Sequence, residues 1–185
     1  MFPHKNDYHV VPAQMFCFWF SFILVLCIIF IHVNLAITEM AIKLKDVFFI
    51  TGTTLLSIKL TRDGWEMPAA GFIILAIGWG VLFAVTDNFG QQIAKEMASS
   101  AFYFLLPAMV LITFYKPFKW WLKVLCLLCL IPFFMSLIDK ISYSGKKEPN
   151  PMWSYIDILS IHLISLIWAC FFFFNHRKQI KQKTD

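Results

Sequence analysis

Polar side chains that could carry chemistry gather in one apolar stretch near the end of the chain. Asp157 and His162 are embedded in it, and Ser160 and Ser165 each follow one of them by three residues. On a helix, this spacing puts each serine on the same face as its partner. A carboxylate, an imidazole and hydroxyl groups are suited to a proton relay, because histidine titrates near physiological pH.

Each of these residues also has a purely structural interpretation. Asp157 lies about one helical turn inside the end of the stretch, where its carboxylate could be solvated, and a neutral His162 could bond to a carbonyl or a serine. We identify no second embedded carboxylate to pass a proton on and no basic counter-ion at mid-depth. His32 and Asn34, near the end of the first apolar stretch, are interpreted as hydrogen-bonding contacts between helices.

The cysteines suggest a second chemistry, because Cys126 and Cys129 form a C-x-x-C pair inside an apolar stretch. Burial in hydrocarbon disfavours the reactive thiolate, so we expect inert thiols that fill the core. Zinc-ligand spacings, glycine-rich phosphate loops and nucleophile motifs are absent from the sequence. We therefore predict no catalytic residue, no cofactor and no metal, an enzymatic role is not favoured, and no family motif is recognised.

The candidates have to be positioned by helices in a membrane, because the chain is too apolar for a soluble domain. It has 185 residues, of which 59% are hydrophobic and 15% charged, and its mean hydropathy is +0.70. Soluble domains have about 45–50% apolar and about 25% charged residues. Five stretches approach the roughly 20 apolar residues that cross a bilayer. We predict an all-α integral membrane protein, a polytopic bundle of about five transmembrane helices.

The predicted helices form one domain, residues 13–175, between a short external tail at 1–12 and a basic cytoplasmic tail at 176–185. The spans are predicted at residues 13–37, 67–85, 98–115, 120–138 and 153–174. Five crossings separate the termini, and most Lys and Arg residues lie in the loops and the tail that follow the odd-numbered spans. The positive-inside rule then places the N-terminus outside and the C-terminus in the cytoplasm, in a plasma (inner) membrane.

The loop at 38–66 contains one organised segment, residues 47–60, which is too short to cross and too apolar for a solvated linker. As a helix it would lie in the headgroup region and gather on one side Phe48, Phe49, Gly52, Leu55 and Leu56. Gly52 and the threonine after it could equally form a two-residue hairpin turn. Both alternatives remain open from the sequence.

Small residues in the second span predict close helix packing. Ala76, Gly80 and Ala84 repeat every four residues and so form a ridge along one helix face. In lipid, such residues let helix backbones approach each other closely. The ridge is predicted to contact another helix, either within one protomer or between protomers.

Two functions are compatible with these observations. The first is a membrane protein without an enzymatic site that serves as an accessory or assembly subunit for a membrane or cytosolic partner. The alternative is an oligomeric ion or proton channel, a carrier, or a membrane-permeabilising protein of toxin-like or immune accessory type, lined by Asp157 and His162.

The formal net charge of +5 comes from basic residues at the ends of apolar runs, which favours anionic lipid and not nucleic acid as the binding partner. The partners expected are therefore the lipid bilayer and either another protein or further copies of the chain. The residues predicted to contact lipid or a partner are Lys43, Lys45, Lys59, Arg62, Arg177, Lys178, Lys181 and Lys183.

Overall fold

The computed structural model describes residues 7–30, 35–88, 103–132, 134–135, 138 and 151–184. These residues form helices joined by short turns, and none of them is in a strand, so the predicted all-α class is confirmed. The helices are α1 (Asp7–Phe30), α2 (Leu35–Arg62), α3 (Glu66–Asn88), α5 (Leu105–Thr113), α6 (Trp120–Leu128) and α8 (Pro151–Thr184).

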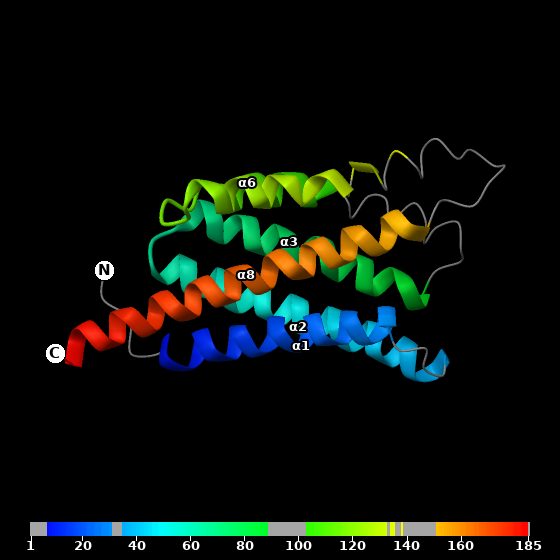
Figure 1. The fold of residues 1–185 in the computed structure, drawn as a ribbon, viewed down its shortest axis with the longest axis horizontal. Coiled ribbons are helices and arrows are strands. Elements are labelled where there is room, and N and C mark those ends of the chain that lie inside the picture. Colours follow the sequence, from blue (N-terminus) through cyan, green and yellow to red (C-terminus); the bar gives the residue numbers. More distant parts are fainter. Residues whose placement is uncertain are drawn as a thin grey trace.

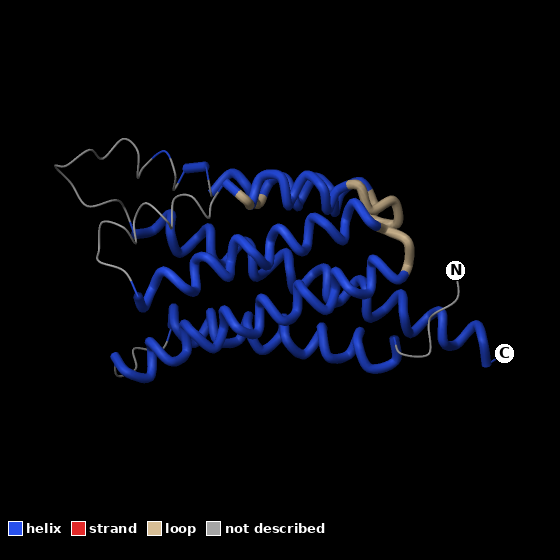
Figure 2. Tube along the Cα trace, turned by 180° about the vertical axis from the view of Figure 1, so that it is seen from behind, coloured by secondary structure: helices blue, strands red, loops and turns tan. Residues whose placement is uncertain are grey.

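The helices lie side by side along the long axis of the molecule, and consecutive helices run in opposite directions (Figure 1). Side-chain bonds fix this arrangement: Ser21 of α1 bonds to the backbone of Lys45, and Ser57 of α2 bonds to the backbone of Ala69 in α3. Consequently α1 and α3 are parallel. The beginning of α1 and the end of α8 lie at the same end of the bundle, as the reverse view also shows (Figure 2).

Among the described residues, three helices are long and apolar enough to cross a membrane: His9–Phe30, Glu66–Ala84 and Ile156–Lys178. They correspond to the first, second and fifth predicted spans. The other two predicted spans, 98–115 and 120–138, are described only in part, as α5 and as a shorter apolar helix, Trp120–Pro132.

The predicted extramembrane loop at 38–66 is instead mostly the 28-residue helix α2, which packs along α1 and α3. Residues 47–60 are therefore helical, and the hairpin alternative is wrong. The predicted apolar face contributes to the core, since Phe49, Gly52 and Leu56 are buried. A Cβ atom on Gly52 would lie 3.1 Å from the Phe18 ring, which shows how closely α1 approaches α2.

The helix boundaries also differ from the prediction at both ends of the chain. α1 begins at Asp7 and ends at Phe30, and residues 35–37 of the first predicted span belong to α2. α8 continues to Thr184, so most of the predicted basic tail is helical. A tight turn separates α2 from α3: Gly64 has a φ of 76°, and the Trp65 N–H donates to the Leu60 carbonyl at 2.8 Å.

Large apolar side chains cover the outside of the bundle, while many polar ones lie inside. Phe16, Ile77 and Trp120 are each more than half exposed. Soluble proteins rarely expose so much apolar surface in continuous patches. An apolar exterior is what lipid favours, in agreement with the three long apolar helices.

The closest backbone approach involves a glycine outside the predicted small-residue ridge. A Cβ atom on Gly71 would lie 2.8 Å from the carbonyl oxygen of Ala108, so this glycine lets α3 meet α5. On the ridge, a Cβ atom on Gly80 would meet nothing within 4 Å, Ala76 is half-buried and Ala84 is exposed. Around Gly80, the described helices therefore make no close contact within the protomer.

Candidate functional site

A pair of opposite charges is buried inside the bundle, on α2. Lys45 and Asp46 are only 7% and 6% exposed, and the Lys45 ammonium donates a hydrogen bond to the Asp46 carboxylate. The same carboxylate oxygen accepts a hydrogen bond from the indole N–H of Trp79 on α3, with a nitrogen–oxygen distance of 2.8 Å. The Ser21 hydroxyl of α1 donates to the Lys45 carbonyl at 2.8 Å. Three helices thus hold the pair in place.

His162 of α8 completes this site and is 1% exposed. Its ring centroid lies 4.9 Å from that of Phe49 and 5.6 Å from that of Trp79. Trp79 therefore links His162 to the Lys45–Asp46 pair, because its indole N–H bonds to Asp46. We call the group formed by Lys45, Asp46, Trp79 and His162 the central site.

The bonding of His162 determines which of its nitrogens is available. Nδ1 lies 2.8 Å from the carbonyl oxygen of Ile158, and because a carbonyl only accepts, Nδ1 carries the proton. Nε2 then has a free lone pair. It is buried and has no hydrogen-bond partner among the described residues. The central site therefore holds one unused proton acceptor beside an ion pair.

The central site lies far from both ends of the bundle. Ser21 and Trp79 are each nine residues before the end of their helices, which is about 13 Å of helix, and His162 is eleven residues after the start of α8. Water at the helix ends is therefore remote from all of these groups.

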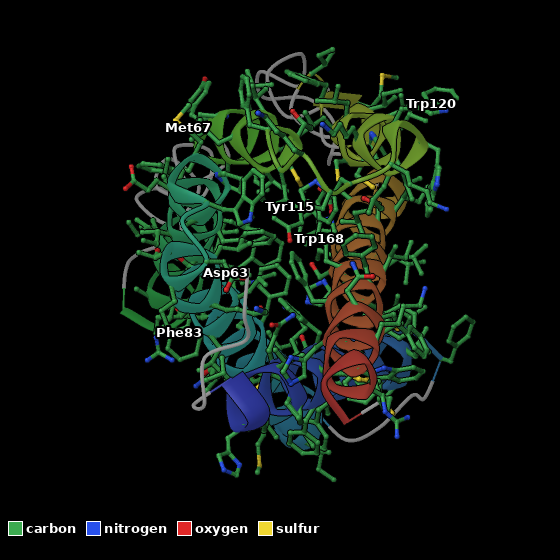
Figure 3. The ribbon with its side chains drawn as sticks, turned by 90° about the vertical axis from the view of Figure 1, so that its left-hand side faces the viewer. Asp63, Met67, Phe83, Tyr115, Trp120 and Trp168 are labelled. Carbon is green, nitrogen blue, oxygen red and sulfur yellow. The ribbon has the colours of Figure 1, made fainter. Side chains whose placement is uncertain are left out.

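A second pair of opposite charges lies at the end of the bundle that contains the turn at 63–65 and the connection at 114–119. Lys59 donates to Asp63 at 2.7 Å, and the Asp63 side chain is 20% exposed. Figure 3 looks onto this end, and Asp63, Tyr115 and Trp168 point toward the interior. Burial raises the pKa of the Tyr115 hydroxyl, and the negative charge of Asp63 raises it further.

The predicted relay residues Ser160, His162 and Ser165 of α8 bond to backbone carbonyls of the same helix. The Ser160 hydroxyl donates to the Asp157 carbonyl at 2.8 Å, and the Ser165 hydroxyl donates to the Ile161 carbonyl at 2.7 Å. Asp157 is 4% exposed, so the alternative of a solvated carboxylate is wrong. For His162, the predicted bond to a carbonyl is confirmed. His32 and Asn34 lie outside the described residues.

The basic residues predicted to contact lipid or a partner do not form one surface. Lys45 and Lys59 are buried in ion pairs, so they do not belong to it. Arg62, Arg177 and Lys178 are exposed near the end that carries Asp63. Lys43 lies nineteen residues before Arg62 on α2, roughly 28 Å away along the helix. The side chains of Lys181 and Lys183 lie outside the described part of the chain.

The cysteine pair lies inside the bundle as predicted. Cys126 is fully buried and accepts a hydrogen bond from the Trp168 indole at 3.3 Å, while the Cys129 sulfur lies 3.7 Å from the Ser160 carbonyl. Beside Cys129, an apolar hollow of about 230 Å³ lies between α6 and α8. Within the described residues, no three His, Cys, Asp or Glu side chains are grouped to hold a metal ion.

Sequence reasoning missed Ser21, Asp46 and Trp79 and assigned Lys45 to lipid or partner contact, because the loop assignment of residues 38–66 kept α2 outside the bundle. One signal was present: Lys45 and Asp46 are adjacent opposite charges, directly before the apolar segment that begins at Val47. No protein-family model, curated protein or solved structure matches this chain. Its function therefore has to be argued from the central site.

Proposed function

We propose that this protein is a multi-pass membrane protein that moves protons or small ions across the bilayer through the interior of its bundle. The observation that supports this most is the buried Lys45–Asp46 pair beside the free nitrogen of His162. Charged groups in hydrocarbon are costly, and where they occur they usually line ion or proton pathways. The helices around the pair have apolar outer faces, so the two charges face the interior of the bundle and not the lipid.

The direction of the helices supports a membrane position for the central site. α1 and α3 are parallel, and both contain stretches long and apolar enough to cross. A chain that crosses twice in the same direction must return between the two crossings. We infer that α2 is this return crossing, which brings Lys45 and Asp46 near the membrane centre.

The alternating order of α1, α2, α3, α5, α6 and α8 corresponds to an even number of crossings. Both termini are then on one side, at the end where Arg62, Lys116, Lys119, Arg177 and Lys178 are exposed. The positive-inside rule makes this the cytoplasmic side. The proposal keeps the predicted cytoplasmic C-terminus and replaces the predicted external N-terminus with a cytoplasmic one.

Proton or ion flux into vesicles tests the proposed transport. The purified protein is reconstituted into liposomes that contain a pH-sensitive dye, and flux is started by a pH gradient or a salt gradient. We expect flux above that of empty liposomes, reduced at least tenfold by His162→Asn. The control is His9→Asn, because His9 is exposed on α1 and should leave flux unchanged. Absence of flux in the parent protein would contradict transport, and full flux in His162→Asn would contradict the assigned site.

The accessory or assembly role is a second candidate, and the surface near the cytoplasmic end supports it. Trp120 is 75% exposed there, close to the exposed Lys116 and Lys119. Aromatic and basic residues together favour contact with a protein partner or with anionic headgroups. Affinity purification of the parent and of a variant with Arg177 and Lys178 changed to Ala tests this role. An unchanged set of co-purifying proteins would count against docking through the end of α8.

A further inference from the structure

Gln14 of α1 is a second buried polar group with unmet bonding capacity. It is 0% exposed, and both its amide nitrogen and its amide oxygen are buried without a hydrogen-bond partner among the described residues. A buried amide that bonds to nothing loses the hydration it had in the unfolded chain and gains nothing in exchange. Its donor and its acceptor therefore both require a partner.

Gln14 lies on the side of α1 that also faces the central site. It is seven residues before Ser21, which is two helical turns, so the two side chains share a face about 10 Å apart along the axis. Ser21 bonds to Lys45 of the central site. α1 packs against both α2 and α8. Gln14 thus lies on the cytoplasmic side of the central site, along the same interior face.

Buried hydroxyl groups lie on the same side of the central site. Thr53 and Ser57 on α2, and Ser165 on α8, are each less than 3% exposed. All three hydroxyls donate to backbone carbonyls, and a hydroxyl oxygen retains lone pairs that accept further hydrogen bonds. Thr53 is eight residues from Lys45 and Ser165 three residues from His162 toward the Gln14 end, whereas Ser57, twelve residues from Lys45, lies beyond Gln14. Large apolar side chains fill most of this interior.

We propose that a short single file of water molecules links Gln14 to Nε2 of His162, and that the transported species is the proton. This inference rests on the proposed function and names its substrate. Water satisfies an amide donor and an amide acceptor at once, which is the usual role of buried water. Phe18 and Leu56 are fully buried in this part of the core, and their bulk leaves no passage for a hydrated metal cation.

The proton transfer needs only water and Nε2 of His162. A hydronium in the file gives a proton to Nε2 of His162: one O–H bond breaks, one N–H bond forms, and the products are neutral water and an imidazolium. The imidazolium adds a positive charge beside the Trp79 ring, whose indole N–H bonds to the Asp46 carboxylate. Transfer of the Nε2 proton to a water molecule regenerates the neutral ring, as one N–H bond breaks and one O–H bond forms.

The first experiment measures proton flux and potassium flux in the same proteoliposomes for the parent, Gln14→Leu and Gln14→Glu. Leucine has a similar volume but no polar atoms, whereas glutamate keeps two oxygens that bond to water. We expect proton flux without potassium flux in the parent, at least a tenfold loss in Gln14→Leu, and flux closer to the parent in Gln14→Glu. Potassium flux equal to proton flux, or full proton flux in Gln14→Leu, would overturn the inference.

A second measurement detects the water without any transport. Radiolysis of bound water oxidises adjacent side chains, so in the detergent-purified parent we expect oxidation of Phe18, which is 1% exposed, and several-fold less in Gln14→Leu. Phe72, equally buried on α3, is the control and should remain unmodified. If Phe18 in the parent stays unmodified, the proposed water file is contradicted. A modified Phe18 in a protein without flux supports the water file and overturns the transport proposal.

Discussion

Two Lys–Asp pairs, one in the middle of α2 and one at its end, make the same kind of interaction in different surroundings. Lys45 and Asp46 lie in the middle of α2, with Trp79 as an additional donor to the carboxylate. Lys59 and Asp63 lie where α2 ends, and the Asp63 carboxylate is partly exposed. Both lysine side chains are buried, and the pairs differ in their carboxylates, since the Asp63 side chain is 20% exposed and that of Asp46 is 8% exposed.

This difference separates a structural pair from a functional one. Near a helix end, a lysine extends its charge toward water, and such a pair contributes little to stability. In the middle of a bundle, both charges lose their hydration, and replacing such a pair by apolar residues is often neutral or stabilising. Stability alone does not explain the central pair, which is why we assign it a function.

Removing one charge from each pair gives the largest expected difference. Asp46→Asn leaves Lys45 buried without its counter-ion, and we expect it to lower the free energy of unfolding by about 3–5 kcal/mol. Asp63→Asn should cost less, because the Asp63 side chain is 20% exposed and Lys59, although buried, lies three residues before the end of α2 and can extend its ammonium toward water. Denaturation in mixed micelles, followed by circular dichroism, measures both. Equal losses would show that the two environments do not differ.

A tryptophan at each site allows a second comparison of the two sites. Trp79→Phe removes a hydrogen bond to a charged carboxylate, which should cost about 1.5–3 kcal/mol. Trp65 at the other site packs edge-on against Tyr115, with ring centroids 5.1 Å apart, and Trp65→Phe keeps an aromatic ring there. We expect it to cost about 0.5 kcal/mol. The same denaturation assay compares the two variants, and a larger loss for Trp65→Phe would reverse the ranking.

Replacing the whole central pair tests whether its role is functional. The double variant Lys45→Met with Asp46→Leu leaves no unpaired charge but removes the acceptor of the Trp79 N–H, so it should cost about 1–3 kcal/mol, less than Asp46→Asn alone. Proton flux should fall to the level of empty liposomes. A folded double variant with parental flux would exclude the pair from the transport mechanism.

The smallest expected effect is a change in alkaline stability at the cytoplasmic end. Because the pKa of Tyr115 is raised in the folded protein, the unfolded chain loses that proton first, near pH 10. Stability should therefore be unaffected by this group below about pH 10 and should fall as the pH rises further. Tyr115→Phe should reduce that fall, and Asp63→Asn should make it smaller, because the pKa of Tyr115 in the folded protein is then raised less. Identical profiles for the parent and Tyr115→Phe would contradict this.

The sequence predicted the apolar helices well, because a long run of apolar residues indicates a membrane span whatever helices pack against it. Spans predicted at 67–85 and 153–174 correspond to α3 and α8. α2 was missed for a physical reason: hydropathy averages over all faces of a helix, and the charges of Lys45, Asp46 and Lys59 hide a helix that turns these charges inward.

The same averaging explains the incomplete prediction of the site. His162 was identified because a lone imidazole in an apolar run is conspicuous. Its neighbours Asp46 and Trp79 come from helices far apart in the sequence, and only packing brings them together. Gln14 illustrates the opposite case, since an amide near a helix start has no sequence signal until its burial is known.

Two-sided cysteine labelling tests most directly whether α2 crosses the membrane. In a background with the five native cysteines replaced, Glu39→Cys and Arg62→Cys place one exposed thiol near each end of α2. An impermeant maleimide is added outside intact, sealed right-side-out cell vesicles, before and after permeabilisation. Our account predicts that Cys at 39 reacts in intact vesicles, whereas Cys at 62 reacts only after permeabilisation. If both thiols react from the same side, α2 does not cross, and the central site is not a membrane site.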